Sequence, residues 1–495
     1  MSARSHLPGW NYLVVILAAF VSVGAYLFFS QRFYGPGFPL DDAWIYQTYA
    51  RNLAWRSEWA FLPGVPSGGS TGPLWSILLA PGYWLRLSPF FWTWLMGCLI
   101  LAAVGVIGMW LFALSWPALK TSSIWVGLAL VLEWHLVWAA GSGMETLAFS
   151  ALVLFVLGLL LVIPHRARSW FWIGLLIGLS VWLRPEGVTL LGPAGLCVAL
   201  APKPRKQKLP YLLSLMAGFL LLFCAYLGFN WMVGGSWWPT TYYAKQEEYQ
   251  ALQSIPYLVR WLRLLALPLV GVGVVLLPGL GYGLWRAWHQ RSWGIWVMAI
   301  WLLAYISVYA WRLPVDYQHG RYLIPAMLVY FWIACGGLLA WLSKLRQGRV
   351  EYLASRVWAL TAVFVLLGFW GLGARAFAND VAVIESEMVA AARWVAEYTP
   401  EDALVAAHDI GALGYFGERD ILDLAGLVSP AVIPFIRDQA RLAAFLDQQG
   451  ADYLMTFPDW YPELATQGHQ LFSTQAPISP SLGGENMAVY RWPQP

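Results

Sequence analysis

The sequence predicts a polytopic α-helical membrane protein that crosses the bilayer about eleven times and carries a small C-terminal α/β domain on the outer face. Of its 495 residues, 59% are hydrophobic and only 11% are charged, which is more apolar surface than a soluble protein buries. The 33 Trp and 24 Tyr suit the two membrane interfaces. Charge is also unevenly divided: residues 380–495 hold 16 acids and five Arg, whereas residues 1–379 hold 10 acids and 25 basic residues.

The membrane spans are predicted from apolar runs of spanning length, roughly 17–25 residues. Eleven runs have this character: 11–29, 91–114, 122–140, 146–163, 170–183, 187–201, 211–231, 262–285, 293–311, 322–342 and 355–376. With eleven crossings, the Lys/Arg clusters all fall on the cytoplasmic side, as the positive-inside rule requires. The N-terminus is then cytoplasmic and the C-terminal domain extracytoplasmic.

A shorter apolar run at 71–87 is broken by Pro81 and Gly82. As a full crossing it would place Lys120 outside and disturb the charge order. We therefore expect a half-embedded segment on the outer side, within a first outer loop that covers residues 30–90.

Two domains follow from the change in composition near residue 379. Residues 1–378 form the predicted membrane domain, and residues 379–495 form the extracytoplasmic α/β domain. The pattern within the second domain predicts an amphipathic helix at 381–398 and short strands at 403–407, 421–424, 453–456 and 488–492.

Acidic residues of the membrane domain gather on the predicted outer side. Of the ten acids before residue 380, eight fall in outward loops or at outer helix ends: Asp41, Asp42, Glu58, Glu145, Glu186, Glu247, Glu248 and Asp316. This distribution favours an outward-facing polar site. The alternative is that outer loops simply tolerate acids.

The first outer loop carries the strongest local pattern. Ile45, Tyr49 and Leu53 recur at helical spacing and predict an amphipathic helix that lies at the membrane interface. Asp41 and Asp42 stand at its start, where free backbone N–H groups favour acids. One Asp is enough for a cap, so the adjacent pair indicates either capping or a functional role.

Short motifs in this loop resemble the first outer loop of GT-C-class glycosyltransferases: DDAWI at 41–45, YARNL at 49–53 and GSTGPLW at 69–75. The resemblance is greatest to the branch that contains the mycobacterial arabinofuranosyltransferases. Protein O-mannosyltransferases and aminoarabinose transferases are more distant. Further pieces follow in order at 142–146, 184–187, 239–245, 320–325 and 408–416, so the ordered set covers nearly the whole chain.

The resemblance implies a GT-C fold in the plasma membrane and an inverting glycosyltransferase. Such an enzyme moves a sugar from a polyprenyl-phosphate carrier to a hydroxyl of a glycan, lipid or protein at the outer face. A positioned carboxylate accepts the hydroxyl proton, and cationic groups stabilise the departing phosphate. By this resemblance Asp41 is the predicted base, and Asp42 supports it, caps the helix or binds a metal.

Further site residues are expected to bind the donor and the acceptor: Glu145, Arg184, Glu186, Tyr242, Lys245, His319, Arg321, His408 and Asp409. Arg321 is the first candidate for the lipid phosphate, since guanidinium forks match phosphate oxygens, and Lys245 is the second. Glu145 either orients the acceptor or shares a divalent cation, Mg²⁺ or Mn²⁺, with Asp41 and Asp42. Structural alternatives stay open, namely an Arg184–Glu186 ion pair, a turn cap at Asp409 and interfacial anchoring by Arg321.

The alternative function is a membrane transporter or lipid flippase with an outer binding domain. Transporters place ionisable groups near the bilayer midplane, often on broken helices. Here only Glu133 and His135 fall within a span, and the other candidates ring the outer boundary. The expected partners are therefore membrane lipid, the lipid-linked donor and the acceptor, with no nucleic acid, since the basic surplus follows membrane topology.

Overall fold

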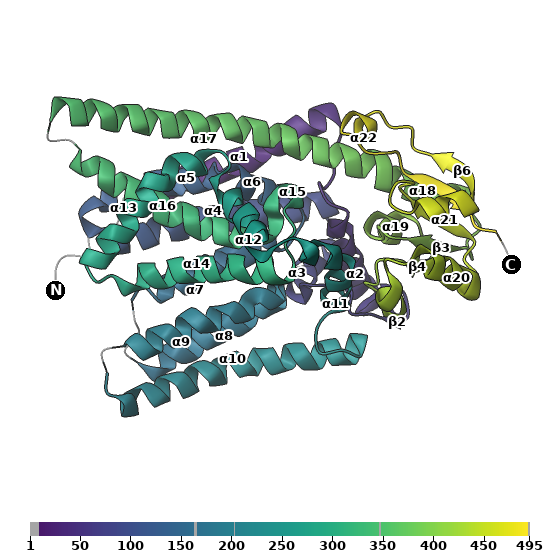
Figure 1. Cartoon of the computed structure of the whole chain (residues 1–495), viewed down its shortest axis with the longest axis horizontal. Helices are drawn as coiled ribbons and strands as arrows, with labels where there is room; N and C mark the ends of the chain where they lie inside the picture. Colours follow the sequence, from purple (N-terminus) through teal and green to yellow (C-terminus); the bar gives the residue numbers. More distant parts are fainter. Residues whose placement is uncertain (1–8, 163–165, 202, 346–347, 494–495) are drawn as a thin grey trace.

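The computed structural model describes residues 9–162, 166–201, 203–345 and 348–493 of the chain. Long helices form a bundle, and a small sheet with short helices lies at one end of it (Figure 1). Six helical segments in the described ranges are long and apolar enough to cross a membrane. They contain α1 (Gly9–Phe33), α4 (Pro89–Ser115), α10 (Arg205–Gly234), α14 (Trp293–Arg312), α16 (Ile324–Lys344) and α17 (Arg349–Val383).

The remaining predicted spans are bent or short. One bent pair joins α5 (Ser123–Val131) to α6 (Trp134–Gly141) at 57°, and another joins α12 (Tyr257–Ala266) to α13 (Val272–His289) at 98°. Three apolar helices are shorter than a usual span: α7 (Thr146–Leu159), α8 (Ala167–Leu183) and α9 (Leu191–Leu200). Every predicted span thus has a helical counterpart. Length and composition support six crossings, or eight with the bent pairs, and the count of eleven stays a prediction.

Close helix packing depends on small residues where backbones meet, as is usual in membrane bundles. A Cβ at Gly174 of α8 would lie 2.0 Å from the carbonyl oxygen of Leu215 in α10. A Cβ at Gly218 of α10 would lie equally close to the carbonyl oxygen of Phe171. These two glycines therefore allow α8 and α10 to touch along their backbones.

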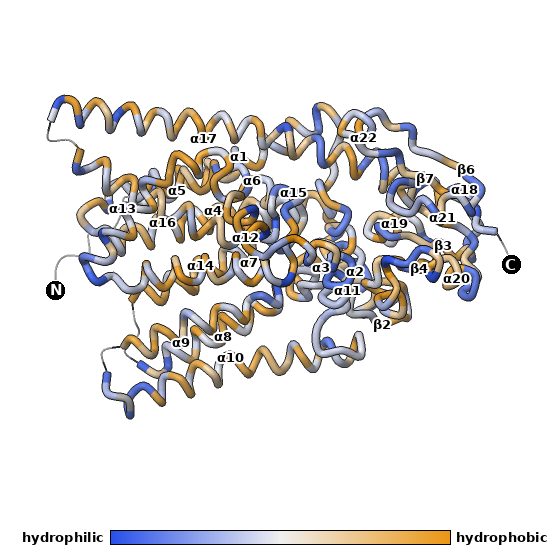
Figure 2. Tube along the Cα trace, viewed as in Figure 1, coloured by the Kyte–Doolittle hydropathy of each residue, from blue (hydrophilic) through white to orange (hydrophobic). Residues whose placement is uncertain are grey.

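Hydropathy separates the bundle from its ends. Apolar residues follow the helices, while hydrophilic residues gather where α10 and α17 begin and around the C-terminal sheet (Figure 2). This pattern is that of a multi-pass membrane protein with polar regions on two sides.

The last membrane helix continues into the C-terminal region. α17, a π-helical turn at Ile384–Val389 and α18 (Ala390–Tyr398) together make a 50-residue segment, Arg349–Tyr398. The predicted domain start at residue 379 therefore lies inside a continuous helix, because the spanning and amphipathic segments follow each other without a break.

A five-stranded sheet has the order β4-β3-β5-β7-β6, with β3 parallel to β4 and β5, and β7 antiparallel to β5 and β6. The strands are β3 (Leu404–Ala407), β4 (Asp420–Asp423), β5 (Tyr453–Thr456), β6 (His469–Ser473) and β7 (Ala488–Arg491). Four of them match the predicted strands. β6 was not predicted, because it is an edge strand whose first three residues are exposed and show no apolar alternation.

The first outer loop contains α2 (Asp42–Arg56), the hairpin β1 (Ala60–Leu62) and β2 (Val65–Pro66), and α3 (Pro73–Trp84) in the place of the predicted half-embedded segment. The predicted helix is present, but the face that an amphipathic helix would expose is covered, since positions 43–50 of α2 are all buried. α19 (Gly411–Phe416) covers that face. The Trp44 ring lies 4.7 Å from the ring of Tyr415 and 4.6 Å from that of Phe416.

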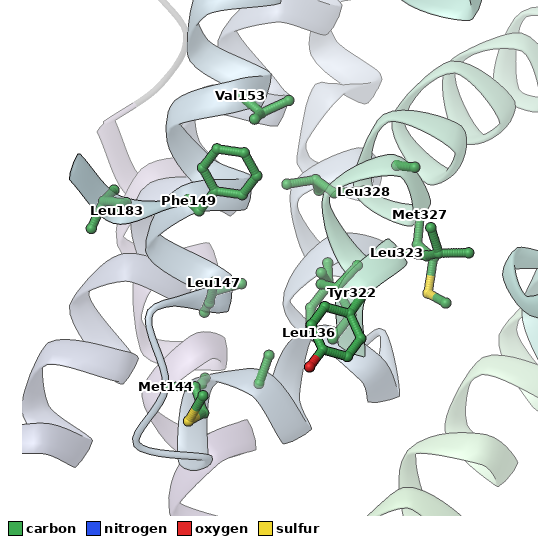
Figure 3. Packing of buried hydrophobic residues seen from close by; sticks show 14 of the residues in the cluster. Leu136, Met144, Leu147, Phe149, Val153, Leu183, Tyr322, Leu323, Met327 and Leu328 are labelled. Carbon is green, nitrogen blue, oxygen red and sulfur yellow. The ribbon is translucent and has the colours of Figure 1, made fainter. Parts of the chain in front are cut away.

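Short helices complete the described chain. They are η1 (Pro117–Ser122), η2 (Pro185–Leu190), α11 (Thr240–Glu248), η3 (Gln250–Ser254), η4 (Leu267–Leu269), α15 (Tyr317–Gly320), η5 (Arg321–Leu323), η7 (Pro430–Phe435), α20 (Gln439–Gln449), α21 (Pro462–Gln467) and α22 (Ile478–Ser481). Beneath them, Leu136, Phe149, Leu183 and Leu323 belong to a buried core between α6, α7, α8 and the start of α16 (Figure 3). This core fixes the helix ends that carry the charged residues.

The predicted orientation can be tested by labelling single cysteines. Gln448 in α20 and Lys206 at the start of α10 are both exposed. In a Cys224→Ser background, which removes the exposed native thiol, Gln448→Cys should react with an impermeant maleimide in intact cells. Lys206→Cys should react only after permeabilisation. The reverse result would place the C-terminal domain in the cytoplasm.

Candidate active site

Three charged side chains from distant segments meet at the boundary between bundle and sheet. Asp42 is the first residue of α2, Lys245 lies on α11 and Arg321 begins η5. Asp42 Oδ2 is 2.6 Å from Arg321 Nη2 and 3.7 Å from Lys245 Nζ. Burial alone would raise the pKa of Asp42, but attraction to Lys245 and Arg321 outweighs it and lowers that pKa. Asp42 is therefore an ionised carboxylate between two cations.

Two cavities meet at this cluster, and Asp42, Lys245 and Arg321 line both of them. The first, of about 220 Å³, extends toward α8 and α14. The second, of about 540 Å³, extends toward the C-terminal sheet. The cluster thus forms the wall that the two cavities share.

Arg184 is the centre of the charged groups in the first cavity. Its Nη1 donates to Glu145 Oε1 at 2.7 Å, and its Nε donates to Glu186 Oε2 at 3.3 Å. Tyr309 donates to Glu186 Oε1 at 2.5 Å. The predicted Arg184–Glu186 ion pair is present, and Glu145 joins it, so these charges are compensated within the protein.

Several buried polar atoms around the cavities have no hydrogen-bond partner among the described residues. They are Nε and Nη1 of Arg321, Oε2 of Glu145 and Oδ2 of Asp409. Arg321 is only 3% exposed, and an unpaired buried donor on a charged group costs free energy. The Nε and Nη1 nitrogens of a guanidinium match two oxygens of a phosphate in spacing, so Arg321 has donors available for an anion.

Asp41 points away from the cations and toward the C-terminal region. Its two carboxylate oxygens accept hydrogen bonds from the backbone N–H groups of Gly411 and Ala412, both at 2.7 Å. A Cβ at position 411 would lie 2.1 Å from the Asp41 carbonyl oxygen, so glycine is required there. Burial, followed by repulsion from Asp409, raises the pKa of Asp41, and the two backbone hydrogen bonds oppose this shift only in part.

The second cavity contains residues from the loop after β3. His408 Nδ1 lies 2.7 Å from the Tyr461 hydroxyl, and its Nε2 lies 3.6 Å from Glu248 Oε1. Burial alone would lower the pKa of His408, but Tyr461 and Glu248 raise it above its usual value. Burial raises the pKa of the adjacent Asp409.

Ten of the eleven predicted site residues line one cavity or the other: Asp41, Asp42, Glu145, Arg184, Glu186, Tyr242, Lys245, Arg321, His408 and Asp409. His319 lines neither. Its Nε2 lies 2.7 Å from Asp380 Oδ2, which ties α15 to α17. His319 therefore lines neither cavity, and its position does not support the predicted binding role.

The predicted site residues did not include the cavity residues Tyr309, Tyr322 and Trp460, nor Glu248, which was named only among the outer acids. Glu248 follows Lys245 by three positions, so helical spacing could have placed both on one face. Tyr309 and Trp460 carry no local signal, because their partners come from distant parts of the chain.

The carboxylates do not fit a shared divalent cation. Asp42 is directed at two cations, Glu145 at Arg184, and Asp41 at two backbone N–H groups. In the part of the chain that the structure describes, no group of three or more His, Cys, Asp or Glu residues is arranged to hold a metal. The proposed metal ligands are therefore better described as ion-pairing and hydrogen-bonding groups.

Solved structures with a similar fold are glycosyltransferases. An oligosaccharyltransferase from Archaeoglobus fulgidus is 12% identical, with 91% of this chain and 70% of that chain covered and a TM-score of 0.63. ArnT from Cupriavidus metallidurans bound to undecaprenyl phosphate is 15% identical over 98% of both chains, with a TM-score of 0.54. The arabinofuranosyltransferase AftD from Mycobacteria is 14% identical and covers 98% of this chain and 40% of its own, with a TM-score of 0.53.

These likenesses confirm the GT-C fold that the sequence motifs implied. A family described as a domain of unknown function, DUF8728, matches residues 379–490. The search against curated proteins finds no match.

The buried Arg184–Glu145 pair gives a stability prediction. Arg184→Met leaves Glu145 as an uncompensated buried charge and should lower the free energy of unfolding by about 3–5 kcal/mol. The double variant Arg184→Met with Glu145→Gln should recover much of this loss. Thermal unfolding in detergent measures both effects, and equal losses in the single and double variants would contradict the pairing.

Proposed function

We propose that this chain is an inverting glycosyltransferase that moves a sugar from a polyprenyl-phosphate carrier to a hydroxyl acceptor at the outer face of the plasma membrane. The observation that carries the proposal is the position of Asp42, Lys245 and Arg321 in the shared wall of two cavities. A transfer between two substrates needs two binding spaces that meet at one point, with cations there for the leaving phosphate.

The first cavity is assigned to the donor. Arg321 has two nitrogens without a partner among the described residues and Lys245 adds a second cation, so the phosphate of the carrier fits beside them. Trp238, Val308 and Leu313 line the same cavity and suit the start of an isoprenoid chain. In support, one structure of similar fold holds undecaprenyl phosphate and another holds a dolichol-phosphate.

The second cavity is assigned to the acceptor. The acceptor oxygen attacks the anomeric carbon while the bond from that carbon to the phosphate oxygen breaks. Attack from the face opposite the phosphate inverts the anomeric centre, and the carrier leaves as polyprenyl phosphate. The acceptor proton passes to a carboxylate, for which Asp41 is the better candidate, because its raised pKa makes it a stronger base than Asp42.

A transporter or flippase is not favoured. Glu133 and His135 lie at the start of α6 in the bent pair α5–α6, and Glu133 Oε1 lies 2.8 Å from His135 Nδ1. Glu133 also accepts the backbone N–H of Leu136 and so caps α6 after the bend. This pair has a structural explanation and does not require a transport pathway.

The proposal is tested by incubating membranes that contain the protein, and that supply acceptors, with polyprenyl-phosphate arabinose, mannose, glucose or galactose and following transfer of the sugar from the carrier. One of these donors should be used, and Asp41→Asn should reduce the rate by about 10²–10⁴-fold, as expected for loss of a general base. Asp420→Asn, which removes an exposed acid of β4, is the control. Full activity of Asp41→Asn would rule out the base assignment.

The pH dependence gives a separate test. Asp41 acts only when ionised, so the rate should fall as the pH drops through its pKa. Asp409 helps to raise that pKa, so Asp409→Asn should lower it and move the acidic limb of the rate profile to lower pH. Asp420→Asn, the control, should leave the pH of the acidic limb unchanged. If Asp409→Asn also leaves it unchanged, Asp41 does not determine the acidic limb.

A further inference from the structure

We propose that the second cavity binds a carbohydrate acceptor, with a sugar ring stacked on Trp460 and its hydroxyls held by Glu248 and Asp409. This inference rests on the proposed function. It selects one acceptor class, a carbohydrate, from the three that the proposed function leaves open, namely a glycan, a lipid or a protein. The cavity measures about 540 Å³. That volume lies in the usual range of small-molecule sites, about 300–1,000 Å³.

Trp460 provides an aromatic surface inside this cavity. It lies in the loop between β5 and α21 and is 47% exposed, although most other Trp side chains near the sheet are packed. The edge-on ring of His408, 5.5 Å away at 86°, supports it. A sugar ring has a face of apolar C–H groups and a rim of hydroxyls. The flat indole can pack against that face while polar groups and solvent bind the hydroxyls.

The polar groups around Trp460 can bind that rim. Asp409 Oδ2 is buried and has no partner among the described residues, so it is an acceptor for a hydroxyl. Glu248 Oε1 lies 3.6 Å from His408, which holds it at the cavity wall. Gln439 Oε1 accepts the backbone N–H of Glu463 at 2.9 Å, which fixes its amide nitrogen as a donor. The cavity thus combines an aromatic ring with two carboxylate acceptors and one amide donor, the kinds of group that a polyhydroxylated ligand requires.

The other acceptor classes fit this lining less well. A lipid chain needs a continuous apolar path, but only five of the nineteen lining residues are aliphatic: Ile45, Ile410, Ala425, Leu427 and Ile436. The groups offered to the ligand are mainly side-chain carboxylates, hydroxyls and cations, which suit hydroxyls better than a peptide backbone. Asp41 and Asp42 line the same cavity as Trp460, so a sugar bound there shares one space with the proposed base.

Binding is measured first, without turnover, by saturation-transfer NMR on the full chain in detergent with methyl glycosides of neutral disaccharides. Trp460→Ala should weaken binding about tenfold or more, and Trp460→Phe should retain most of it. Trp55→Ala is the matched control, since Trp55 is 65% exposed and lines neither cavity. If Trp460→Ala unfolds early, Glu248→Gln provides the second variant and should also weaken binding.

Donor cleavage in the presence of acceptors separates the two proposals. Glycoside binding that depends on Trp460 supports the inference even where no lipid-linked sugar is cleaved, an outcome that would overturn the transferase proposal alone. Donor cleavage with transfer to a peptide or a lipid, or glycoside binding unchanged in Trp460→Ala, would overturn the carbohydrate assignment and leave the transferase proposal standing.

Discussion

The ion cluster of Asp42, Lys245 and Arg321 holds together segments that the sequence separates by about 200 and 280 positions. Arg321 is buried and would be left without its carboxylate partner if α2 moved away, so the cluster favours one arrangement of α2, α11 and η5. Because the same three side chains form the shared wall of two cavities, the position of each binding space depends on this cluster. The same ion cluster thus contributes to the stability of the fold and to the geometry of the two cavities.

The C-terminal domain completes the site as well as covering it. Asp41 accepts two backbone hydrogen bonds from the loop that begins α19, and Arg51 donates to the carbonyl oxygens of Tyr415 and Gly414. These contacts bring His408 and Trp460 to the edge of the membrane bundle. The second cavity is therefore built from both parts of the chain, and neither part forms it alone.

Local sequence signals predicted much of this arrangement and failed where contacts are distant. Hydropathy located the helices, and ordered motifs located Asp42, Lys245 and Arg321, because both signals lie within short windows. The burial of α2 could not be predicted from local sequence, since α19, which covers it, lies more than 350 residues later in the chain. Trp460 could not be distinguished among 33 tryptophans. His319 was grouped with Arg321 by proximity in sequence, but it pairs with Asp380 instead.

Asp41 and Asp42 show why adjacent identical residues need a structure to be told apart. Their side chains diverge, one toward Gly411 and Ala412 and the other toward Lys245 and Arg321. Burial and Asp409 raise the pKa of Asp41, whereas the two cations lower that of Asp42. Two carboxyls whose environments move their pKa values apart are suited to different tasks. This divergence supports Asp41 as the proton acceptor and Asp42 as the residue that holds the phosphate-binding cations in place.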